Sequence, residues 1–489
     1  MTLDISRFIS SKYGKRIALI DWGGENYSYL DVERIANYIV GRLKEDGIVK
    51  GDRVSVISQN KAALVILYLA CQKIGAILVP NNLRLTEQEL LSTNLRVEPK
   101  IIVLSESLQE KYGRLCAVLA VKVEILERIG RPVHVTSNET VEVDLETPSL
   151  ILFTGGTTGE PKGAVLSNRS IIFNAINTVL SWKLSENDRT VLVYPLFHTG
   201  GWNVLTIPLL IAGGSIILVD KFDASLVLRI MDGMKITVFS GVPAMMAQIS
   251  ESENFNGSQL SSLRFVKSGG GTTPEHVTER FRNKGINFYQ GYGLTEAGPN
   301  LFYSNEDDLN RPFSIGRKSL FVDLKLLDQN GQESDLGELM VGGPVIFSGY
   351  FRDAKKTEDI MNCGMVRTGD ILRRDEDGFY YFVGRIKFMY KSGGENVYPS
   401  EVEKVLESYS GIYESAVIGV PDDKWGEVGA AFIDVRRDID LKELKEWLST
   451  KMANYAVPKY FRVVKSIPKT GAGKKDYTLM RKWYNEWKT

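Results

Sequence analysis

The chain has 489 residues, which is too long for one ordinary domain, so we expect at least two domains. Its 60 basic and 60 acidic side chains cancel, which argues against recruitment of nucleic acid or an anionic membrane surface. Three scattered cysteines and three histidines, none at the spacing of a zinc motif, argue against a disulfide scaffold and a zinc enzyme. The N-terminus lacks the apolar core of a signal peptide, and the most apolar runs are interrupted, so we expect a cytoplasmic protein without an integral membrane segment.

Short runs rich in Val and Ile alternate with longer amphipathic stretches through the first two thirds of the chain. The runs predict strands at 53–58, 76–80, 100–104, 149–153, 190–194, 215–219, 236–240 and 264–268. The amphipathic stretches predict helices that include 60–74, 168–181 and 224–234. Alternation of this kind is typical of mainly parallel sheets covered by helices, which bind ligands beyond the carboxyl ends of their strands.

The pattern changes after about residue 320. Short alternating runs separated by Gly and Asp turns predict a small β subdomain, with strands at 322–328, 337–343 and 378–384. The last hundred residues predict an α+β unit, with helices at 400–409 and 441–451 and strands at 414–421 and 430–436. We therefore expect an α/β protein with a large N-terminal domain over 1–386 and a small C-terminal domain over 387–489.

One glycine-rich stretch, "FTGGTTGEPKG" at 153–163, directly follows the predicted strand "SLILF". It is either a mobile surface turn or a loop whose N–H groups, hydroxyls and lysine grip phosphate. It is not a Walker A motif, because Lys162 follows Pro161 and Gly159 is followed by Glu160. A P-loop fold is therefore excluded on spacing, while phosphate binding by another kind of loop stays open.

Five further motifs follow in order along the chain. They are "YPLFHTGG" (194–201), "QGYGLTEAG" (290–298), "RTGD" (367–370), "GRIKFMYKSGGENVYPSEVE" (384–403) and "PKTGAGKK" (468–475). Together with the glycine-rich loop they resemble, over essentially the whole chain, the adenylate-forming superfamily of acyl- and aryl-CoA synthetases, luciferase and peptide-synthetase adenylation domains. The resemblance implies an AMP-binding domain over 1–386 and a mobile lid domain over 387–489.

The resemblance also implies which residues bind ATP. The loop would hold the β- and γ-phosphates through Thr154, Gly155, Gly156, Thr157, Thr158, Gly159 and Lys162. Position 155 is serine in many relatives, so one hydroxyl contact is expected to be missing here. The adenine would rest against glycine-rich turns and an aromatic ring, formed by Gly269, Gly270, Gly271, Gln290, Gly291, Tyr292 and Gly293. Asp370 would accept hydrogen bonds from the ribose with help from Arg385, unless the two merely pair with each other in a hinge.

Four residues would carry the chemistry. The resemblance puts Thr295 near the α-phosphate and makes Glu296 the ligand of Mg²⁺, a hard cation that prefers carboxylates; a solvated loop charge is the alternative. Lys474, which follows Gly473 as the family spacing requires, would bridge the carboxylate and the α-phosphate. By itself, a lysine near a terminus is usually surface decoration. His198 would lie near the carboxylate and gate the acyl pocket, or be a hydrogen-bonded core histidine.

A conformational step follows from the same resemblance. Lys387 matches the hinge about which the small domain rotates between the two half-reactions. The next residue is Phe388, where relatives usually have Asp or Glu, so the hinge departs from the pattern. Lys391, Gly393 and Gly394 would line the channel through which the thiol of coenzyme A enters.

These implications predict a ligase that uses ATP, Mg²⁺ and coenzyme A to convert a carboxylic acid into its CoA thioester. Trp202 and the apolar residues after it favour a medium- or long-chain fatty acid, although a helix core explains them equally well. An aryl acid such as succinylbenzoate is the alternative acid. The stretch 235–248 lacks the acidic residue expected for an amino-acid substrate, and the presence of Lys474 and Glu296 disfavours a non-catalytic nucleotide sensor. A separate carrier protein as thiol donor and pairing as a homodimer are left open.

Overall fold

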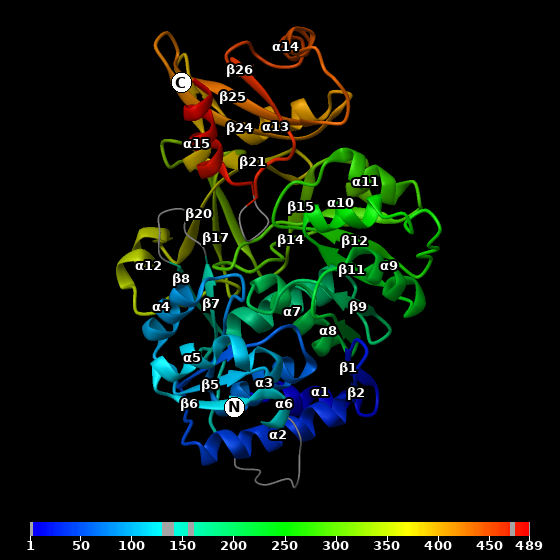
Figure 1. Ribbon diagram of the computed structural model, residues 1–489, viewed down its shortest axis with the longest axis vertical. Coiled ribbons are helices and arrows are strands. Elements are labelled where there is room, and N and C mark those ends of the chain that lie inside the picture. Colours follow the sequence, from blue (N-terminus) through cyan, green and yellow to red (C-terminus); the bar gives the residue numbers. More distant parts are fainter. Residues whose placement is uncertain (1–2, 130–140, 155–160, 470–474, 489) are drawn as a thin grey trace.

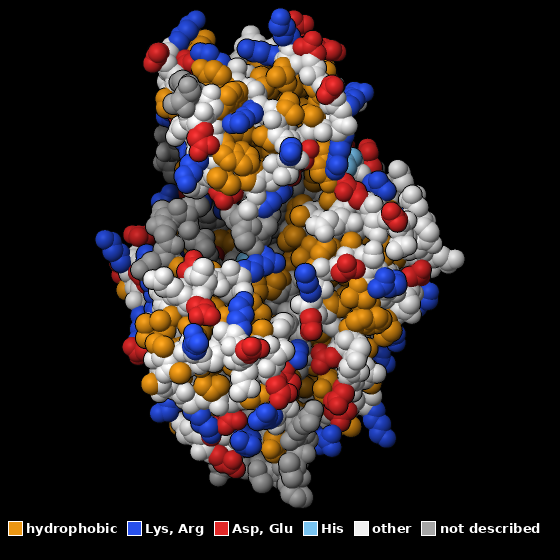
Figure 2. Space-filling view, in the orientation of Figure 1, with side chains coloured by type: hydrophobic (Ala, Val, Ile, Leu, Met, Phe, Trp, Pro, Cys, Tyr) orange, Lys and Arg blue, Asp and Glu red, His pale blue; other side chains and the backbone are white. Residues whose placement is uncertain are grey.

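A computed structural model describes residues 3–129, 141–154, 161–469 and 475–488. They form a large body of layered sheets and helices, with a smaller C-terminal lobe above it (Figure 1). The surface is hollowed between the lobe and the body, where hydrophobic side chains gather (Figure 2). In the described ranges, no helix combines the length and apolar character that a membrane crossing requires.

The largest sheet of the body has the strand order β18-β8-β7-β4-β3-β5-β6. Its five parallel strands are β3 (Arg53–Ile57), β4 (Ile77–Pro80), β5 (Ile101–Leu104), β6 (Lys122–Ile125) and β7 (Pro148–Thr154). Two antiparallel strands extend it, β8 (Lys162–Ser167) and β18 (Gly349–Tyr350). Helix α3 (Ala62–Ile74) is apolar almost throughout because all of its residues except Ala63 and Lys73 are buried.

Two further sheets complete the layered body. One has the order β2-β1-β10-β9, formed by β1 (Ile17–Asp21), β2 (Asn26–Ser28), β9 (Arg189–Leu192) and β10 (Ser215–Leu218). The other is wholly parallel, formed by β11 (Val238–Gly241), β12 (Phe265–Ser268) and β13 (Asn287–Gln290). Short Val- and Ile-rich strands of this kind are buried on both faces when helices cover them.

The other helices of the body cover these sheets (Figure 1). They are α1 (Ile5–Tyr13), α2 (Tyr29–Glu45), α4 (Glu87–Val97), α5 (Gln109–Leu119), α6 (Leu126–Ile129), α7 (Asn168–Ser181), α8 (Thr206–Ala212), α9 (Ala224–Gly233), α10 (Pro243–Glu251), α11 (Glu275–Arg282) and α12 (Ala354–Ile360). Helix α7 begins and ends at the predicted residues, and α9 ends one residue early. Ser167 caps α7, because its side chain accepts a hydrogen bond from the N–H of Ser170.

The predicted β subdomain is an antiparallel sheet with the order β14-β15-β21-β20-β17-β16, in which β19 also pairs with β20. Its strands are β14 (Phe302–Tyr303), β15 (Ser314–Lys318), β16 (Asp323–Leu327), β17 (Leu336–Gly342), β19 (Met361–Asn362), β20 (Met365–Arg374) and β21 (Tyr380–Arg385).

The C-terminal lobe contains a sheet built around one long antiparallel pair. The strands are β22 (Tyr390–Ser392), β23 (Glu395–Val397), β24 (Ile412–Asp422), β25 (Gly426–Val435) and β26 (Tyr460–Val464). The helices are α13 (Pro399–Glu407), α14 (Leu441–Ser449) and α15 (Tyr477–Lys488). The predicted fold class is therefore confirmed: mainly parallel sheets with helices and a β subdomain, followed by a small α+β unit.

One strand of the largest sheet was not predicted. The chain leaves β7 at Thr154 and returns along β8 from Lys162, and these two residues pair across an antiparallel ladder. The short polar start of β8 carries little strand signal in the sequence, because its residues mix one lysine with glycine and alanine.

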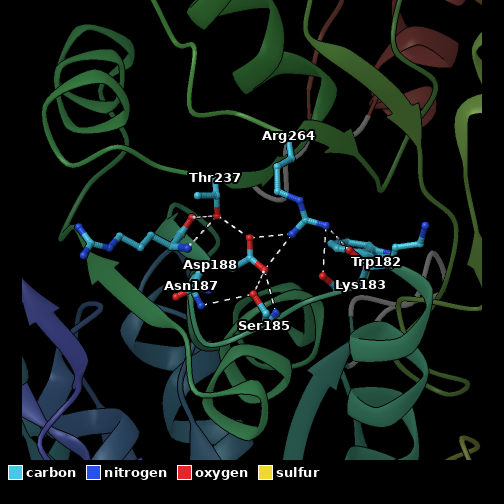
Figure 3. Close-up of polar contacts among 8 residues, drawn as sticks. Trp182, Lys183, Ser185, Asn187, Asp188, Thr237 and Arg264 are labelled. Carbon is cyan, nitrogen blue, oxygen red and sulfur yellow. Dashed lines mark hydrogen bonds and ion pairs between the residues drawn. The ribbon is translucent and has the colours of Figure 1, made fainter.

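An ion pair with a buried carboxylate ties two of the sheets together (Figure 3). Asp188, just before β9, accepts two hydrogen bonds from one nitrogen of Arg264, at 2.7 and 2.8 Å. Its carboxylate also accepts from the hydroxyl of Thr237 at 2.7 Å and from the N–H of Ser185 at 2.8 Å. Because these partners come from the starts of different strands, the carboxylate cross-links the sheet that contains β9 to the sheet that contains β11 and β12.

Candidate active site

Two glycine-rich turns lie side by side where β12 and β13 end. The N–H of Gly291 donates to the carbonyl of Ser268 at 2.6 Å, so the two strand ends are joined directly. Gly270 has φ +82°, a conformation that favours glycine. A Cβ on Gly293 would clash with the backbone of Gly298 and Pro299, which explains why glycine stands there. The predicted adenine-side residues Gly269, Gly270, Gly271, Gln290, Gly291, Tyr292 and Gly293 thus form one neighbourhood.

Tyr292 joins this neighbourhood to the β subdomain. Its hydroxyl donates to Oδ2 of Asp370 at 2.6 Å, and Nε of Arg385 lies 2.8 Å from Oδ1. Asp370 and Arg385 are direct partners across β20 and β21. Burial, and then the charge of Asp370, raises the pKa of Tyr292 well above its ordinary value, so the phenol stays protonated as a donor. The structure therefore brings together three of the residues that the sequence singled out.

Glu296 lies in the turn that follows, and two groups of one short segment hold it. The hydroxyl of Tyr350 donates to Oε1 of Glu296 at 2.7 Å, and the N–H of Phe347 donates to its carbonyl oxygen at 2.9 Å. Thr295, the residue before it, is half-buried in the same turn, which a backbone bridge between Leu294 and Gly298 closes. The site thus has a fixed carboxylate at a partly exposed position.

Lys162 approaches the same tyrosine from the other side. Its ammonium nitrogen lies 5.0 Å from the centre of the Tyr350 ring, a cation–π distance. The hydroxyl of Thr154 donates to the carbonyl of Lys162 at 3.4 Å, across the ends of β7 and β8. Lys162 and Glu296 are therefore gathered around Tyr350, as a site for a phosphate and a cation requires. The remaining predicted phosphate ligands, Gly155, Gly156, Thr157, Thr158 and Gly159, lie outside the described residues, and so does Lys474.

His198 and Trp202 occupy the loop after β9. His198 is half-buried, and its ring lies 5.7 Å from that of Phe197. Trp202 is fully buried in a π-helical turn, where its ring packs 5.0 Å from Tyr68 and its N–H donates to the carbonyl of Leu196. The apolar residues that follow it are buried in α8. Trp202 and the apolar residues after it are therefore accounted for as core residues. They give no evidence of a pocket for a long acyl chain.

The predicted hinge and thiol-channel residues lie in the C-terminal lobe or at its start. Lys387 and Phe388 form a short 3₁₀ turn, and the Phe388 ring packs 4.4 Å from the ring of Tyr477. An aromatic residue in place of the family's acidic one is explained by this contact. Lys391, Gly393 and Gly394 lie in the β22–β23 hairpin, where a Cβ on Gly393 would press on Trp425. In the part of the chain that the structure describes, no hydrogen bond or ion pair links this hairpin to Asp370 or Glu296.

Lys475, the residue after Lys474, is anchored by carboxylates of α13. Its ammonium lies 2.7 Å from Oε2 of Glu403 and 3.6 Å from Glu407. Burial by itself would lower the pKa of Lys475, but the two carboxylates raise it above its ordinary value. Lys475 therefore has a structural ion pair, which separates its role from the one expected of Lys474.

Comparison with known proteins decides the family. A family model described as AMP-binding enzyme matches residues 9–351, and one described as AMP-binding enzyme C-terminal domain matches residues 401–474. The chain belongs to the AMP-binding enzyme family.

Curated relatives of this AMP-binding enzyme differ in the acids that their names give. It is 33% identical to a feruloyl-CoA synthase of Amycolatopsis over 92% of this chain and 93% of that protein. It is 32% identical to a 2-succinylbenzoate–CoA ligase of Bacillus licheniformis, over 94% and 95%. It is 29% identical to the long-chain-fatty-acid–CoA ligase FadD13 of Mycobacterium tuberculosis, over 94% and 93%.

A solved structure agrees over the whole length. The ATP-bound MatB from Rhodopseudomonas palustris superposes with a TM-score of 0.91 and 28% identity, covering 99% of each chain. The expected fold and superfamily are thereby confirmed for this AMP-binding enzyme.

Sequence analysis missed Tyr350, which lies far along the chain from Lys162 and Glu296. Its motif, "GYF", carries no catalytic signal, and only the pairing of β18 with β8 brings it to the site. Lys267 was also missed, because it reads as one residue of a strand. It is 3% exposed, donates to the carbonyl of Phe302 at 3.2 Å and lies 4.9 Å from the Trp182 ring. Its burial lowers its pKa to about 8.

Proposed function

We propose that this AMP-binding enzyme is an AMP-forming acid–CoA ligase whose acid substrate carries an aryl group. The observation that carries the proposal is that two sets of contacting residues meet at the glycine-rich ends of β12 and β13. One set is Asp370 with Tyr292 and Arg385, and the other is Glu296 with Tyr350. A buried carboxylate beside backbone that glycines leave accessible suits a ribose and an adenine. The names of the curated relatives support a CoA ligase as the class.

The donor set also fits a magnesium ion. Within the described ranges, no group of three or more His, Cys, Asp or Glu side chains gathers to hold a metal. A single half-buried carboxylate, Glu296, suits Mg²⁺, since this ion keeps several waters and is shared with substrate phosphates. When bound, the ion would neutralise charge that develops on the leaving pyrophosphate.

The reaction has two steps in this proposal. A carboxylate oxygen of the acid attacks the α-phosphorus of ATP, a new O–P bond forms, and the bond to pyrophosphate breaks. The thiolate of coenzyme A then attacks the carbonyl carbon, and AMP leaves. Lys474 and Thr295 would stabilise charge at the α-phosphate, while Lys162 and residues 154–159 would hold the departing phosphates. Asp370 and Arg385 would orient the ribose, and His198 would border the acyl group.

We also propose the domain division at Lys387, with a lid over 387–489 that rotates between the steps. The ends of the two family models, at 351 and 401, are compatible with this boundary. In the second step, Lys391, Gly393 and Gly394 would border the thiol channel. A homodimer stays a prediction that sedimentation or light scattering can decide.

An aryl acid is preferred over a fatty acid for two reasons. The apolar run after Trp202, which favoured a fatty acid, is buried in the core, and two of the relatives reported above have names of aryl-acid ligases. A long-chain fatty acid is the second candidate, since a relative with that name is 29% identical over almost the whole chain.

The first experiment is ATP-dependent pyrophosphate release, with and without coenzyme A, across ferulate, benzoate, succinylbenzoate, octanoate and palmitate. We expect release that is greatest with an aryl acid and thioester formation when coenzyme A is present. A preference for palmitate would replace the aryl proposal with the fatty-acid one, and no release with any acid would contradict both. Lys474→Ala should abolish release, whereas Lys482→Ala, an exposed lysine of α15, serves as the matched control.

A further inference from the structure

Among the described residues of this neighbourhood, Tyr350 contacts side chains from both the phosphate side and the metal side of the proposed site. Its hydroxyl bonds to Glu296, and its ring faces the ammonium of Lys162 at 5.0 Å. Tyr350 is 9% exposed, and its hydroxyl donates to a carboxylate at 2.7 Å, which is the stronger kind of hydrogen bond.

The backbone around Tyr350 is fixed at several points. Strand β18 pairs with β8, so that Tyr350 lies opposite Ala164. The N–H of Tyr350 donates to the hydroxyl of Thr357 at 2.9 Å. The ring of Phe347 packs edge-on against the Tyr350 ring, with centres 5.1 Å apart. A side chain held by strand pairing, a capped N–H and ring packing has little freedom to turn its hydroxyl elsewhere.

Glu296 is consequently held at two points by one four-residue segment. Phe347 donates to its carbonyl oxygen and Tyr350 to its Oε1, at 2.9 and 2.7 Å. In the described part of the chain, no hydrogen bond reaches the second carboxylate oxygen, Oε2, of Glu296. One oxygen is thus committed to positioning, while the other stays available to a ligand.

We propose that Tyr350 is a positioning residue that fixes the carboxylate of Glu296 for magnesium binding. This inference rests on the proposed function, in which Glu296 is the metal ligand. Tyr350 touches neither the acid nor the reacting phosphorus in this proposal; it acts through Glu296. Because a flexible glutamate must lose rotamer freedom on binding a metal, a carboxylate that is already oriented binds at lower cost.

The test is Tyr350→Phe, which keeps the ring against Lys162 and Phe347 and removes only the hydroxyl. We expect the half-saturating Mg²⁺ concentration for pyrophosphate release to rise about tenfold at saturating ATP, as for a lost hydrogen bond to a charged group. At saturating Mg²⁺, kcat should return close to the wild-type value. Tyr27→Phe is the matched control, since Tyr27 donates to the exposed carboxylate of Glu25 at 3.1 Å, on β2.

A direct binding measurement separates this inference from the catalytic proposal. Mn²⁺ binding to the enzyme with ATP and no acid, followed by electron paramagnetic resonance, should weaken by the same factor in Tyr350→Phe. This readout works even if the enzyme releases no pyrophosphate with the acids tested. If wild type binds Mn²⁺ with ATP but is inactive, the proposed function fails while Tyr350 can still be judged.

A double-variant cycle tests whether Tyr350 acts through Glu296. Tyr350→Phe should add no further loss of Mn²⁺ affinity in a Glu296→Gln background. An unchanged metal affinity in Tyr350→Phe alone would overturn the inference. So would an additive loss in the double variant, because Tyr350 would then act independently of Glu296.

Discussion

Asp188 and Asp370 each pair with one arginine, and in both pairs the aspartate side chain is 3% exposed and the arginine 38%. Burial is therefore the same, but the partners differ. Asp188 accepts from Thr237 and Ser185 as well as Arg264, and Arg264 also donates to the carbonyls of Trp182 and Lys183 (Figure 3). Both oxygens of Asp188 thus accept from groups that hold two sheets together, which suits a structural cross-link.

The Asp370 pair is built differently. Its carboxylate accepts from the hydroxyl of Tyr292, and Arg385 approaches with Nε, one nitrogen of its guanidinium. Among the described residues, the side chain of Arg385 forms no second ion pair or hydrogen bond, while its carbonyl accepts from the N–H of Met389 at 3.1 Å. A pair that leaves most of an arginine's donors unused, next to glycine-rich turns, is suited to a ligand. The position of the partners, rather than burial, thus separates the structural aspartate from the candidate binding aspartate: Tyr292, the partner of Asp370, belongs to the glycine-rich turns.

The largest effect is expected from Asp370→Ala, which should break the site without breaking the fold. We expect kcat/KM for ATP to fall about a thousandfold, because two hydrogen bonds from the ribose to a charged acceptor would be lost. The urea midpoint should fall less than in Asp188→Ala: the Tyr292 hydroxyl loses its acceptor, but Asp188 has more hydrogen bonds to lose. Steady-state kinetics and urea unfolding of the same preparation check both halves. A fall below tenfold would contradict a ribose-binding role.

Lys267 can be set beside the two paired aspartates as a buried charged residue without an ion pair. Among the described residues, no carboxylate lies at ion-pair distance from its ammonium. Its folded-state pKa is about 8, below the ordinary lysine value of about 10.5, so the unfolded state binds more protons between these pH values. Stability should therefore rise with pH across this window, by about 3 kcal/mol in total. The difference in unfolding free energy between wild type and Lys267→Met, measured in urea from pH 7 to 10.5, isolates this effect. A difference that stays constant with pH would contradict it.

Asp188→Ala should lower stability and leave catalysis unchanged, which is the reverse of what we expect for Asp370→Ala. We expect the free energy of unfolding to fall by about 2 kcal/mol, less than for a wholly buried pair because Arg264 stays partly hydrated. The KM for ATP and kcat of the folded enzyme should stay at wild-type values. Urea unfolding with parallel kinetics checks this, and a large rise in the KM for ATP would show that the two aspartates do not differ in role.

The sequence predicts most of the fold because local patterns and tertiary structure agree there. Helix α7 and the strands β10 and β12 lie where Val- and Ile-rich runs and caps indicate them. The antiparallel strand β8 was missed, since its start is held by pairing with β7 rather than by its own propensity. The run after Trp202 was left open between a pocket and a helix core, because an apolar run looks the same in both, and only the structure shows that Trp202 is buried.

The residues of the candidate site also divide into those that the sequence identified and those that it missed. Asp370, Arg385, Tyr292 and Glu296 were identified from motifs, and the structure brings each into a hydrogen bond or an ion pair. Tyr350 and Lys267 could not be identified, because their roles depend on neighbours far away in the chain. A motif shows which residue is present in the sequence. The groups that this residue contacts are known only once the strands are paired in the folded structure.

The smallest expected effect compares the two arginines through the same substitution, Arg to Lys. Arg264 bonds both oxygens of Asp188 and two carbonyls, so Arg264→Lys should lose several of these hydrogen bonds and about 1 kcal/mol of unfolding free energy. Arg385 reaches Asp370 through Nε alone, and a lysine ammonium can supply one such contact. Arg385→Lys should therefore leave stability unchanged.

The kinetic half of the same comparison concerns ATP. If Arg385 merely neutralises Asp370, the KM for ATP should change by less than about threefold in Arg385→Lys, since the positive charge is retained. A much larger rise in this KM, with an unchanged urea midpoint, would mean that the planar guanidinium itself donates to the nucleotide. That outcome would extend the contrast from the aspartates to their arginines: Arg264 would use its donors on carbonyls of the fold, and Arg385 would use its own on the ligand.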